Sequence, residues 1–209
     1  MLDIPLILAT RNRGKISEFR ALLPGFDIEI KSLEDFGPIP AVEEDGKTFE
    51  DNAYKKAHFT ARVLGFPALA DDSGLIVEAL DGRPGVYSAR YAGVDATDED
   101  NNLKLLEAMK GKENRKAAFE SVIVIAVPGG PALTYVGRCA GEIVHEQTGN
   151  NGFGYDPLFY YPPLKKTFAQ MSREEKNSIS HRGKAMSELR EEFDKVIMWL
   201  KQRLAEKPF

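Results

Sequence analysis

The chain has 209 residues, a formal net charge of −4, a hydrophobic share of 43% and a single cysteine, Cys139. A chain of this length can bury a substantial core in one domain. Its acidic balance argues against a protein whose main ligand is a nucleic-acid backbone. The sequence opens without a signal-peptide pattern, and none of its apolar runs approaches the ~18 residues of a membrane span. We expect one domain over residues 1–209 in the cytoplasm, with Cys139 as an apolar strand residue in a reducing compartment.

The first half of the chain predicts strands that alternate with helices. Residues 4–10, "IPLILAT", form a short apolar run typical of a buried strand. Residues 14–25 then show helical spacing that ends at Pro24-Gly25. The further elements of this half are an alternating strand at 26–33, an amphipathic helix at 46–65 with Thr48 as its cap, a strand interrupted by a polar break at 66–80, and a capped helix at 97–111.

The second half predicts a hairpin and a long helix. Residues 117–127 and 132–144 are two long strand-like runs around a Pro-Gly-Gly-Pro turn. The last element, roughly residues 180–204, carries an apolar stripe at helical spacing. Strand–helix alternation followed by a hairpin favours an α/β fold with a mixed sheet.

A candidate phosphate site lies where the first strand gives way to the first helix. Residues 10–15, "TRNRGK", place backbone N–H groups and Lys15 at a helix start, which suits an anion. The P-loop pattern is excluded because Ile16 follows Lys15, where that motif needs Ser or Thr. Taken alone, the segment is equally compatible with an ordinary capped turn.

Acidic residues at a strand end form a candidate metal site. Asp71 and Asp72, in "ADDSG", follow an apolar run, and Glu43 and Glu44 lie just ahead of the helix at 46–65. Carboxylates joined by substrate phosphates are what Mg²⁺ prefers. The alternatives are a simple turn at "DDSG" and a solvated acidic cluster at the helix start.

The stretch "FGYDPLFYYP", residues 153–162, combines a candidate base platform with core residues. Phe153 is flanked by glycines, so a ligand can approach its ring closely and a nucleobase can stack on it. Leu158, Phe159 and Tyr160 are expected to be buried. Further along, Lys176, His181 and Arg182 offer hydrogen-bond donors to a ligand, or alternatively form a surface charge cluster.

Six segments together, in this order, closely resemble the inosine triphosphate pyrophosphatase family: "TRNRGK", "EEDGKTFEDNAYKKA", "ADDSGL", "RPGVYSARYAG", "FGYDPLF" and "SREEKNSISHRGKA". The resemblance extends over essentially the whole chain. It implies an elongated mixed β-sheet with flanking helices, of the Maf/Ham1 type, with two lobes around a central nucleotide cleft. It also implies a homodimer that uses one Mg²⁺ per subunit. The implied house-cleaning reaction hydrolyses ITP, dITP and XTP to the nucleoside monophosphate and pyrophosphate.

The resemblance also implies roles for individual residues. Asp72 is the proton acceptor and, with Glu43, a metal ligand. The expected phosphate contacts are Thr10, Arg11, Asn12, Arg13, Gly14, Lys15 and Lys56, followed by Ser73 as a further substrate contact. The expected base contacts are Phe153, Gly154, Tyr155, Asp156, Lys176, His181 and Arg182. One departure is Gln170, which stands where the family usually carries an acidic residue and which sequence alone gives no role.

Hydrogen-bond polarity gives the base contacts a physical rationale. Hypoxanthine and xanthine present an acceptor oxygen at position 6, whereas adenine presents an amino donor there. Lys176, His181 and Arg182 are donors, so adenine would leave buried donors unpaired at a cost of about 1–3 kcal/mol each. The competing hypotheses are a related pyrophosphatase for other modified nucleotides and a nucleotide-sensing module without turnover.

Overall fold

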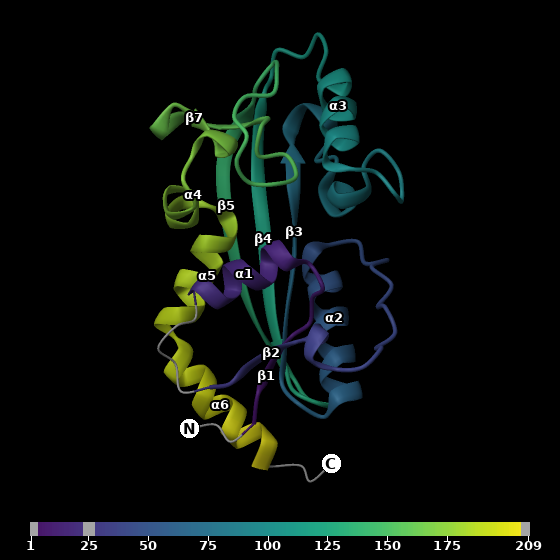
Figure 1. Cartoon of the computed structure of the whole chain (residues 1–209), viewed down its shortest axis with the longest axis vertical. Coiled ribbons are helices and arrows are strands. Elements are labelled where there is room, and N and C mark those ends of the chain that lie inside the picture. Colours follow the sequence, from purple (N-terminus) through teal and green to yellow (C-terminus); the bar gives the residue numbers. More distant parts are fainter. Residues whose placement is uncertain (1–3, 23–27, 206–209) are drawn as a thin grey trace. The chain divides into compact units, whose positions relative to one another are not determined.

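The computed structural model of the protein describes residues 4–22 and 28–205 (Figure 1). Within these residues lies a seven-stranded sheet in the order β2-β1-β3-β4-β5-β6-β7. Strand β1 pairs in parallel with β2 and β3, while β6 pairs antiparallel with β5 and β7. The mixed sheet with flanking helices confirms the predicted α/β fold class.

The helices and strands of the described residues have the following bounds. The strands are β1 Leu6–Leu8, β2 Ile30–Ser32, β3 Ala68–Val77, β4 Lys116–Ala126, β5 Ala132–Ile143, β6 Phe159–Tyr161 and β7 Lys166–Thr167. The α-helices are α1 Arg13–Leu22, α2 Phe49–Leu64, α3 Asp98–Ala108, α4 Arg173–Ile179, α5 His181–Glu191 and α6 Phe193–Ala205. None of these helices is long and apolar enough to cross a bilayer.

Local signals fix the ends of the helices that the sequence predicts best. Helix α2 begins after Thr48, whose hydroxyl accepts the Asp51 N–H while the Asp51 side chain accepts the Thr48 N–H. It ends at Gly65, which has a left-handed φ of 72° that costs glycine little. Helix α3 begins with the same reciprocal cap, formed by Thr97 and Asp100. The predicted helices at 46–65 and 97–111 are therefore confirmed.

The described chain divides into two compact units, and the boundaries fall within β3, β4, β5 and α5. Unit 1 comprises the chain up to Asp72, residues 122–136 and the chain from Ala185 on; unit 2 comprises residues 73–121 and 137–184. Each unit has a hydrophobic cluster of its own.

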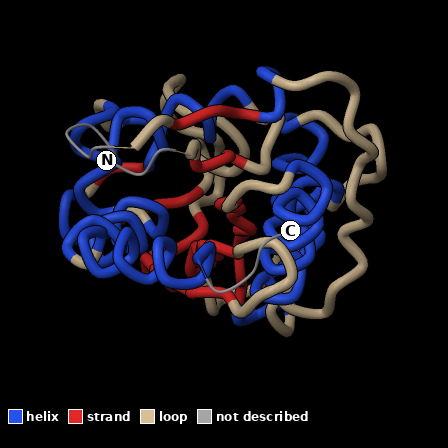
Figure 2. Tube along the Cα trace, turned by 90° about the horizontal axis from the view of Figure 1, so that it is seen from below, coloured by secondary structure: helices blue, strands red, loops and turns tan. Residues whose placement is uncertain are grey.

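In unit 1, strand β1 is buried on both faces. Leu6 and Leu8 belong to a cluster with Phe19 of α1 and Phe193 of α6. Ile7 instead packs with Ala61 of α2, because successive side chains of a strand point to opposite faces. Helices thus cover both faces of the strand, and strands lie between helices in Figure 2.

Unit 2 is built around aromatic rings. Phe119 of β4 lies 4.7 Å from Phe159 of β6 and 5.7 Å from Phe168, between ring centroids. Phe159 and Phe168 are fully buried, and Leu158 beside them is buried as well. The burial expected for Leu158 and Phe159 is confirmed, whereas Tyr160 is partly exposed.

Three predicted elements differ from the structure. The polar break expected within 66–80 does not exist, because β3 continues through Asp71, Asp72 and Ser73. The single helix expected at 180–204 is interrupted at Glu192, where α5 ends and α6 begins. The predicted strand at 26–33 is shorter, with β2 starting at Ile30; residues 26 and 27, and the predicted helix end at Pro24-Gly25, lie outside the described residues.

Candidate active site

Two buried carboxylates of β3 are each paired with a lysine of unit 1. Asp71 Oδ1 lies 3.0 Å from the Lys15 Nζ of α1, and Asp72 Oδ1 lies 3.0 Å from the Lys56 Nζ of α2. The two aspartates are consecutive in a strand and therefore point to opposite faces, toward different helices. The structure brings the predicted residues Lys15, Lys56 and Asp72 to one strand, together with Asp71.

Glu44 and Asn52 complete this charged cluster. The sequence analysis counted Glu44 among the candidate metal carboxylates but gave Asn52 no role. Lys56 Nζ lies 3.3 Å from Glu44 Oε1, and Asn52 Nδ2 donates to Asp72 Oδ2 at 3.2 Å. Glu43 is exposed and forms no ion pair with any residue that the structure describes. Asn52 precedes Lys56 by four residues on α2, so the two side chains lie on one face of the helix. This spacing is the sequence signal that could have identified Asn52.

The electrostatics of the cluster favour a charged lysine and a basic carboxylate. Burial raises the pKa of Asp72, and the nearby Glu44 raises it further, against the opposing effect of Lys56 and Lys15. Burial also acts against the charge of Lys56, but the fields of Asp72, Glu44 and Asp71 outweigh it and raise the pKa of that lysine. A carboxylate with a raised pKa binds a proton more readily, which suits a proton acceptor.

The predicted phosphate turn forms the start of α1. The Asn12 side chain accepts the Lys15 N–H at 3.1 Å and so caps the helix, while Thr10 Oγ1 accepts the Asn12 N–H at 3.1 Å. Arg11 donates to the Ile39 carbonyl at 2.6 Å. Residues 11–14, which include Arg13 and Gly14, are exposed, so this helix start is open to a ligand.

In unit 2, Asp156 links Phe153 to Lys176. One Asp156 oxygen, Oδ2, accepts the Phe153 N–H at 3.0 Å and lies 2.5 Å from Lys176 Nζ. Lys176 Nζ also lies 4.6 Å from the centroid of the Phe153 ring, a cation–π distance. Phe153 is 39% exposed, while Asp156 and Lys176 are buried. A Cβ on Gly152 would lie 1.9 Å from Asp156 Oδ2, so only glycine fits there.

The other predicted base contacts are also packed within unit 2. His181 stacks on Phe119, with ring centroids 4.8 Å apart, and Arg182 Nη2 donates to Ser73 Oγ at 3.0 Å. Both side chains are buried at the start of α5. The Tyr155 hydroxyl donates to the Ser88 carbonyl at 2.8 Å, and burial raises the pKa of this tyrosine. This hydrogen bond anchors Tyr155 to the backbone at Ser88.

Gln170 has a structural role that the sequence did not reveal. Its side-chain oxygen accepts the Thr167 N–H at 2.8 Å, as the reciprocal partner in a capping box. Glutamine and glutamate both fill that position. The departure from the family pattern therefore preserves the local hydrogen bond.

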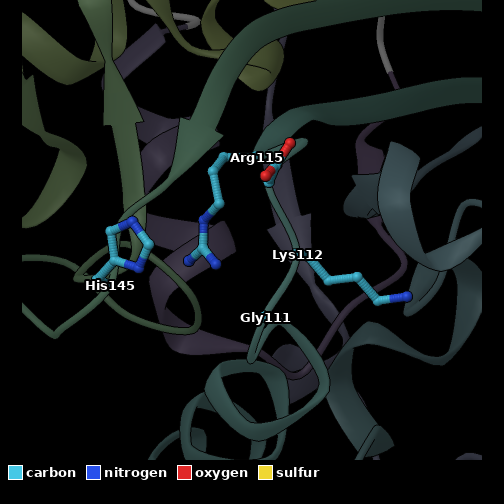
Figure 3. A pocket seen from close by; sticks show the side chains of 5 residues that line it. Gly111, Lys112, Arg115 and His145 are labelled. Atoms are coloured by element: carbon cyan, nitrogen blue, oxygen red, sulfur yellow. The ribbon is translucent and has the colours of Figure 1, made fainter.

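A cavity of about 450 Å³ elsewhere in unit 2 contains none of the predicted site residues. It is lined by Gly111, Lys112, Glu113, Arg115 and His145 (Figure 3). The Arg115 guanidinium donates to the carbonyls of Met109, Ile143 and Val144 at 3.0, 2.8 and 2.6 Å. Arg115 is therefore engaged in holding the backbone around the end of α3.

Comparisons with known proteins agree on one family. The model of the Ham1 family matches residues 6–192. The chain is 61% identical to the dITP/XTP pyrophosphatase of Desulfotalea psychrophila over 97% of this chain and 92% of that protein. It is 60% identical to the protein of the same name from Syntrophobacter fumaroxidans, over 96% and 87%. Among solved structures, the Ham1 protein of Coxiella burnetii aligns with a TM-score of 0.87 at 41% identity, covering 92% and 99% of the two chains. That of Staphylococcus aureus aligns with a TM-score of 0.85 at 42% identity, covering 91% and 98%.

Proposed function

Because the chain belongs to the Ham1 family, we propose that it hydrolyses ITP, dITP and XTP to the nucleoside monophosphate and pyrophosphate. The reaction removes non-standard purine nucleotides before they enter DNA or RNA. The names of the relatives support this substrate class. The observation that carries the proposal is the buried cluster in which Lys15 and Lys56 pair with Asp71 and Asp72.

The lysines of this cluster would bind the triphosphate. The charge that develops on the leaving pyrophosphate needs cationic partners. Lys15 and Lys56 supply two ammonium groups whose side chains are only 16% and 12% exposed. The exposed residues 11–14, around the start of α1, would add backbone N–H groups.

The carboxylates of the cluster fit a divalent cation. Oxygens of Asp72 and Glu44 both lie within ion-pair distance of the Lys56 Nζ, which supports a positively charged ligand beside these carboxylates. Within the described residues no three His, Cys, Asp or Glu side chains form a closed metal site. Two carboxylates completed by substrate phosphates suit Mg²⁺. We propose one Mg²⁺ per subunit, bound by Asp72 and a glutamate. The contact between Glu44 and Lys56 supports Glu44 as that glutamate, and Glu43 remains a prediction.

Asp72 would take the proton of the attacking water. Its raised pKa makes it a stronger base than an exposed aspartate. The water oxygen forms a bond to the α-phosphorus, the bond from that phosphorus to the bridging oxygen breaks, and the water proton passes to Asp72. A bound divalent cation would supply charge neutralisation at the phosphate oxygens.

Unit 2 would bind the base. Phe153 is 39% exposed, which fits a stacking platform, and Lys176, His181 and Arg182 carry N–H donors of the kind that a 6-oxo purine needs. Gly154 and Asp156 support the platform, and Ser73 is held by Arg182. As the family resemblance implies, we propose that residues 1–209 act as one pyrophosphatase domain in a cytoplasmic homodimer.

Pyrophosphate release from ITP, dITP, XTP, GTP and ATP, measured with Mg²⁺ and with excess EDTA, tests the proposal. We expect rapid Mg²⁺-dependent release from the first three nucleotides and slow release from GTP and ATP. Release from all five would contradict the base contacts but retain the triphosphate chemistry. Binding without release would support the nucleotide-sensing module instead.

A further inference from the structure

Helix α3 holds both polar backbone groups of Gly154, the residue that follows the exposed Phe153. The Gly154 N–H donates to Asp98 Oδ2 at 2.7 Å, and its carbonyl accepts from Asn102 Nδ2 at 3.0 Å. Asp98 and Asn102 are four residues apart on α3 and therefore share a face. All of these residues belong to unit 2.

A second contact joins the same helix to Gln147, just ahead of the loop formed by residues 149–157. Gln147 donates to the Glu99 carboxylate, 2.9 Å from Oε1, and its own Oε1 lies 3.4 Å from Asn102 Nδ2. Asn102 is 2% exposed, and its amide nitrogen Nδ2 makes both contacts. Helix α3 thus contacts the chain at Gln147, just ahead of the loop, and again at Gly154 within it.

The backbone of the loop depends on these side chains for its hydrogen bonds. Residues 149–157 form turns and bends without a strand ladder, so their polar groups must find partners elsewhere. The Phe153 N–H donates to Asp156. The N–H and the carbonyl of Gly154 bond to Asp98 and Asn102 of α3. Phe153 is 39% exposed, so the Lys176 Nζ that lies 4.6 Å from its ring centroid constrains the ring only in part. The position of the ring also depends on the backbone that carries it.

We propose that Asp98 and Asn102 are positioning residues for nucleobase binding. They fix the backbone N–H and carbonyl of Gly154 and thereby set the stacking position of Phe153. This inference rests on the proposed function, in which Phe153 stacks on the base. Releasing the backbone of one residue lowers the population of a given conformation by about tenfold. The loss would appear in binding, because a loop that must be ordered by its ligand binds that ligand more weakly.

The test compares Asp98→Ala and Asn102→Ala with two matched controls. Asp98→Asn keeps an oxygen that can accept the Gly154 N–H. Asn101→Ala removes the neighbouring amide, which is similarly buried at 3% exposure but bonds to Ala89 and Ala92 instead. For each variant, kcat and KM for ITP are measured together with the inhibition constants of IMP and pyrophosphate and the melting temperature.

We expect both alanine variants of the positioning pair to raise the KM for ITP and the inhibition constant of IMP by about tenfold. The kcat and the inhibition constant of pyrophosphate should stay within about twofold, since pyrophosphate has no base. Asp98→Asn and Asn101→Ala should bind ITP like the parent.

Parent-like KM values in folded Asp98→Ala and Asn102→Ala would overturn the inference, as would an equal rise in KM for Asn101→Ala. If Asn102→Ala does not fold, the exposed Asp98 decides the question alone. A parent protein that releases no pyrophosphate from ITP would contradict the proposed function itself and the inference with it, so the two failures are distinguishable.

Discussion

The buried ion pair between Lys176 and Asp156 predicts a large loss of stability when only one partner is replaced. The two side chains are 10% and 3% exposed, and Lys176 Nζ lies 2.5 Å from Asp156 Oδ2. Lys176→Met would leave the carboxylate buried without its cation, and such changes cost about 3–5 kcal/mol of unfolding free energy. Asp156 would keep the Phe153 N–H, so we expect a value near ~3 kcal/mol, which lowers the melting temperature of a chain this size by roughly 6–12 °C.

Urea unfolding of Lys176→Met, Asp156→Asn and the double variant measures the pair directly. The double variant should be more stable than Lys176→Met, because the amide removes the unpaired charge and still accepts the Phe153 N–H. Lys166→Met is the matched control, since the Lys166–Glu175 pair has side chains 40% and 41% exposed. It should cost less than about 1 kcal/mol. Equal losses in Lys166→Met and Lys176→Met would refute the reasoning from burial.

Three further predictions concern the site and the helix caps. Phe153→Ala should raise the KM for ITP by roughly 5–150-fold, the equivalent of about 1–3 kcal/mol of stacking, with kcat little changed in steady-state assays. Asp72→Asn should lower kcat by about 10²–10⁴-fold with an unchanged circular dichroism spectrum, and a normal kcat would exclude Asp72 as the proton acceptor. Hydrogen bonds from Thr48 and Thr97 lower the pKa of Asp51 and Asp100, so their contribution to stability is present above the usual aspartate pKa, about 4, and is lost as pH falls below it. Melting temperatures between about pH 6 and about pH 3 should therefore fall less steeply for Asp51→Asn with Asp100→Asn than for the parent.

Helix ends were predictable because their signals are local. Thr48, Asp51 and Gly65 lie within or next to the helix that they delimit, and the structure uses each as the sequence indicated. The continuity of strand β3 through Asp71 and Asp72 was not predictable, because the lysines that compensate their charges are remote in sequence. A polar pair looks like a turn until its distant partners are known.

The candidate site shows the same limit. Motif order indicated Lys15, Lys56 and Asp72, and the structure brings them to one strand. The choice between Glu43 and Glu44 depends on which way the backbone turns, which two adjacent glutamates do not reveal. The sequence analysis missed Asp98 and Asn102 because no signal near them in sequence indicates a contact with Gly154.

The paired charges on β3 have a consequence for ligand choice. Lys15 and Lys56 already have internal counter-ions, so an anion that binds them must exchange partners with a buried carboxylate instead of adding to an open positive patch. Free sulfate or phosphate gains little from such an exchange, because the displaced carboxylate loses its own cation. A nucleotide that arrives with a divalent cation brings the replacement counter-charge, so each of the two ligands should strengthen the binding of the other.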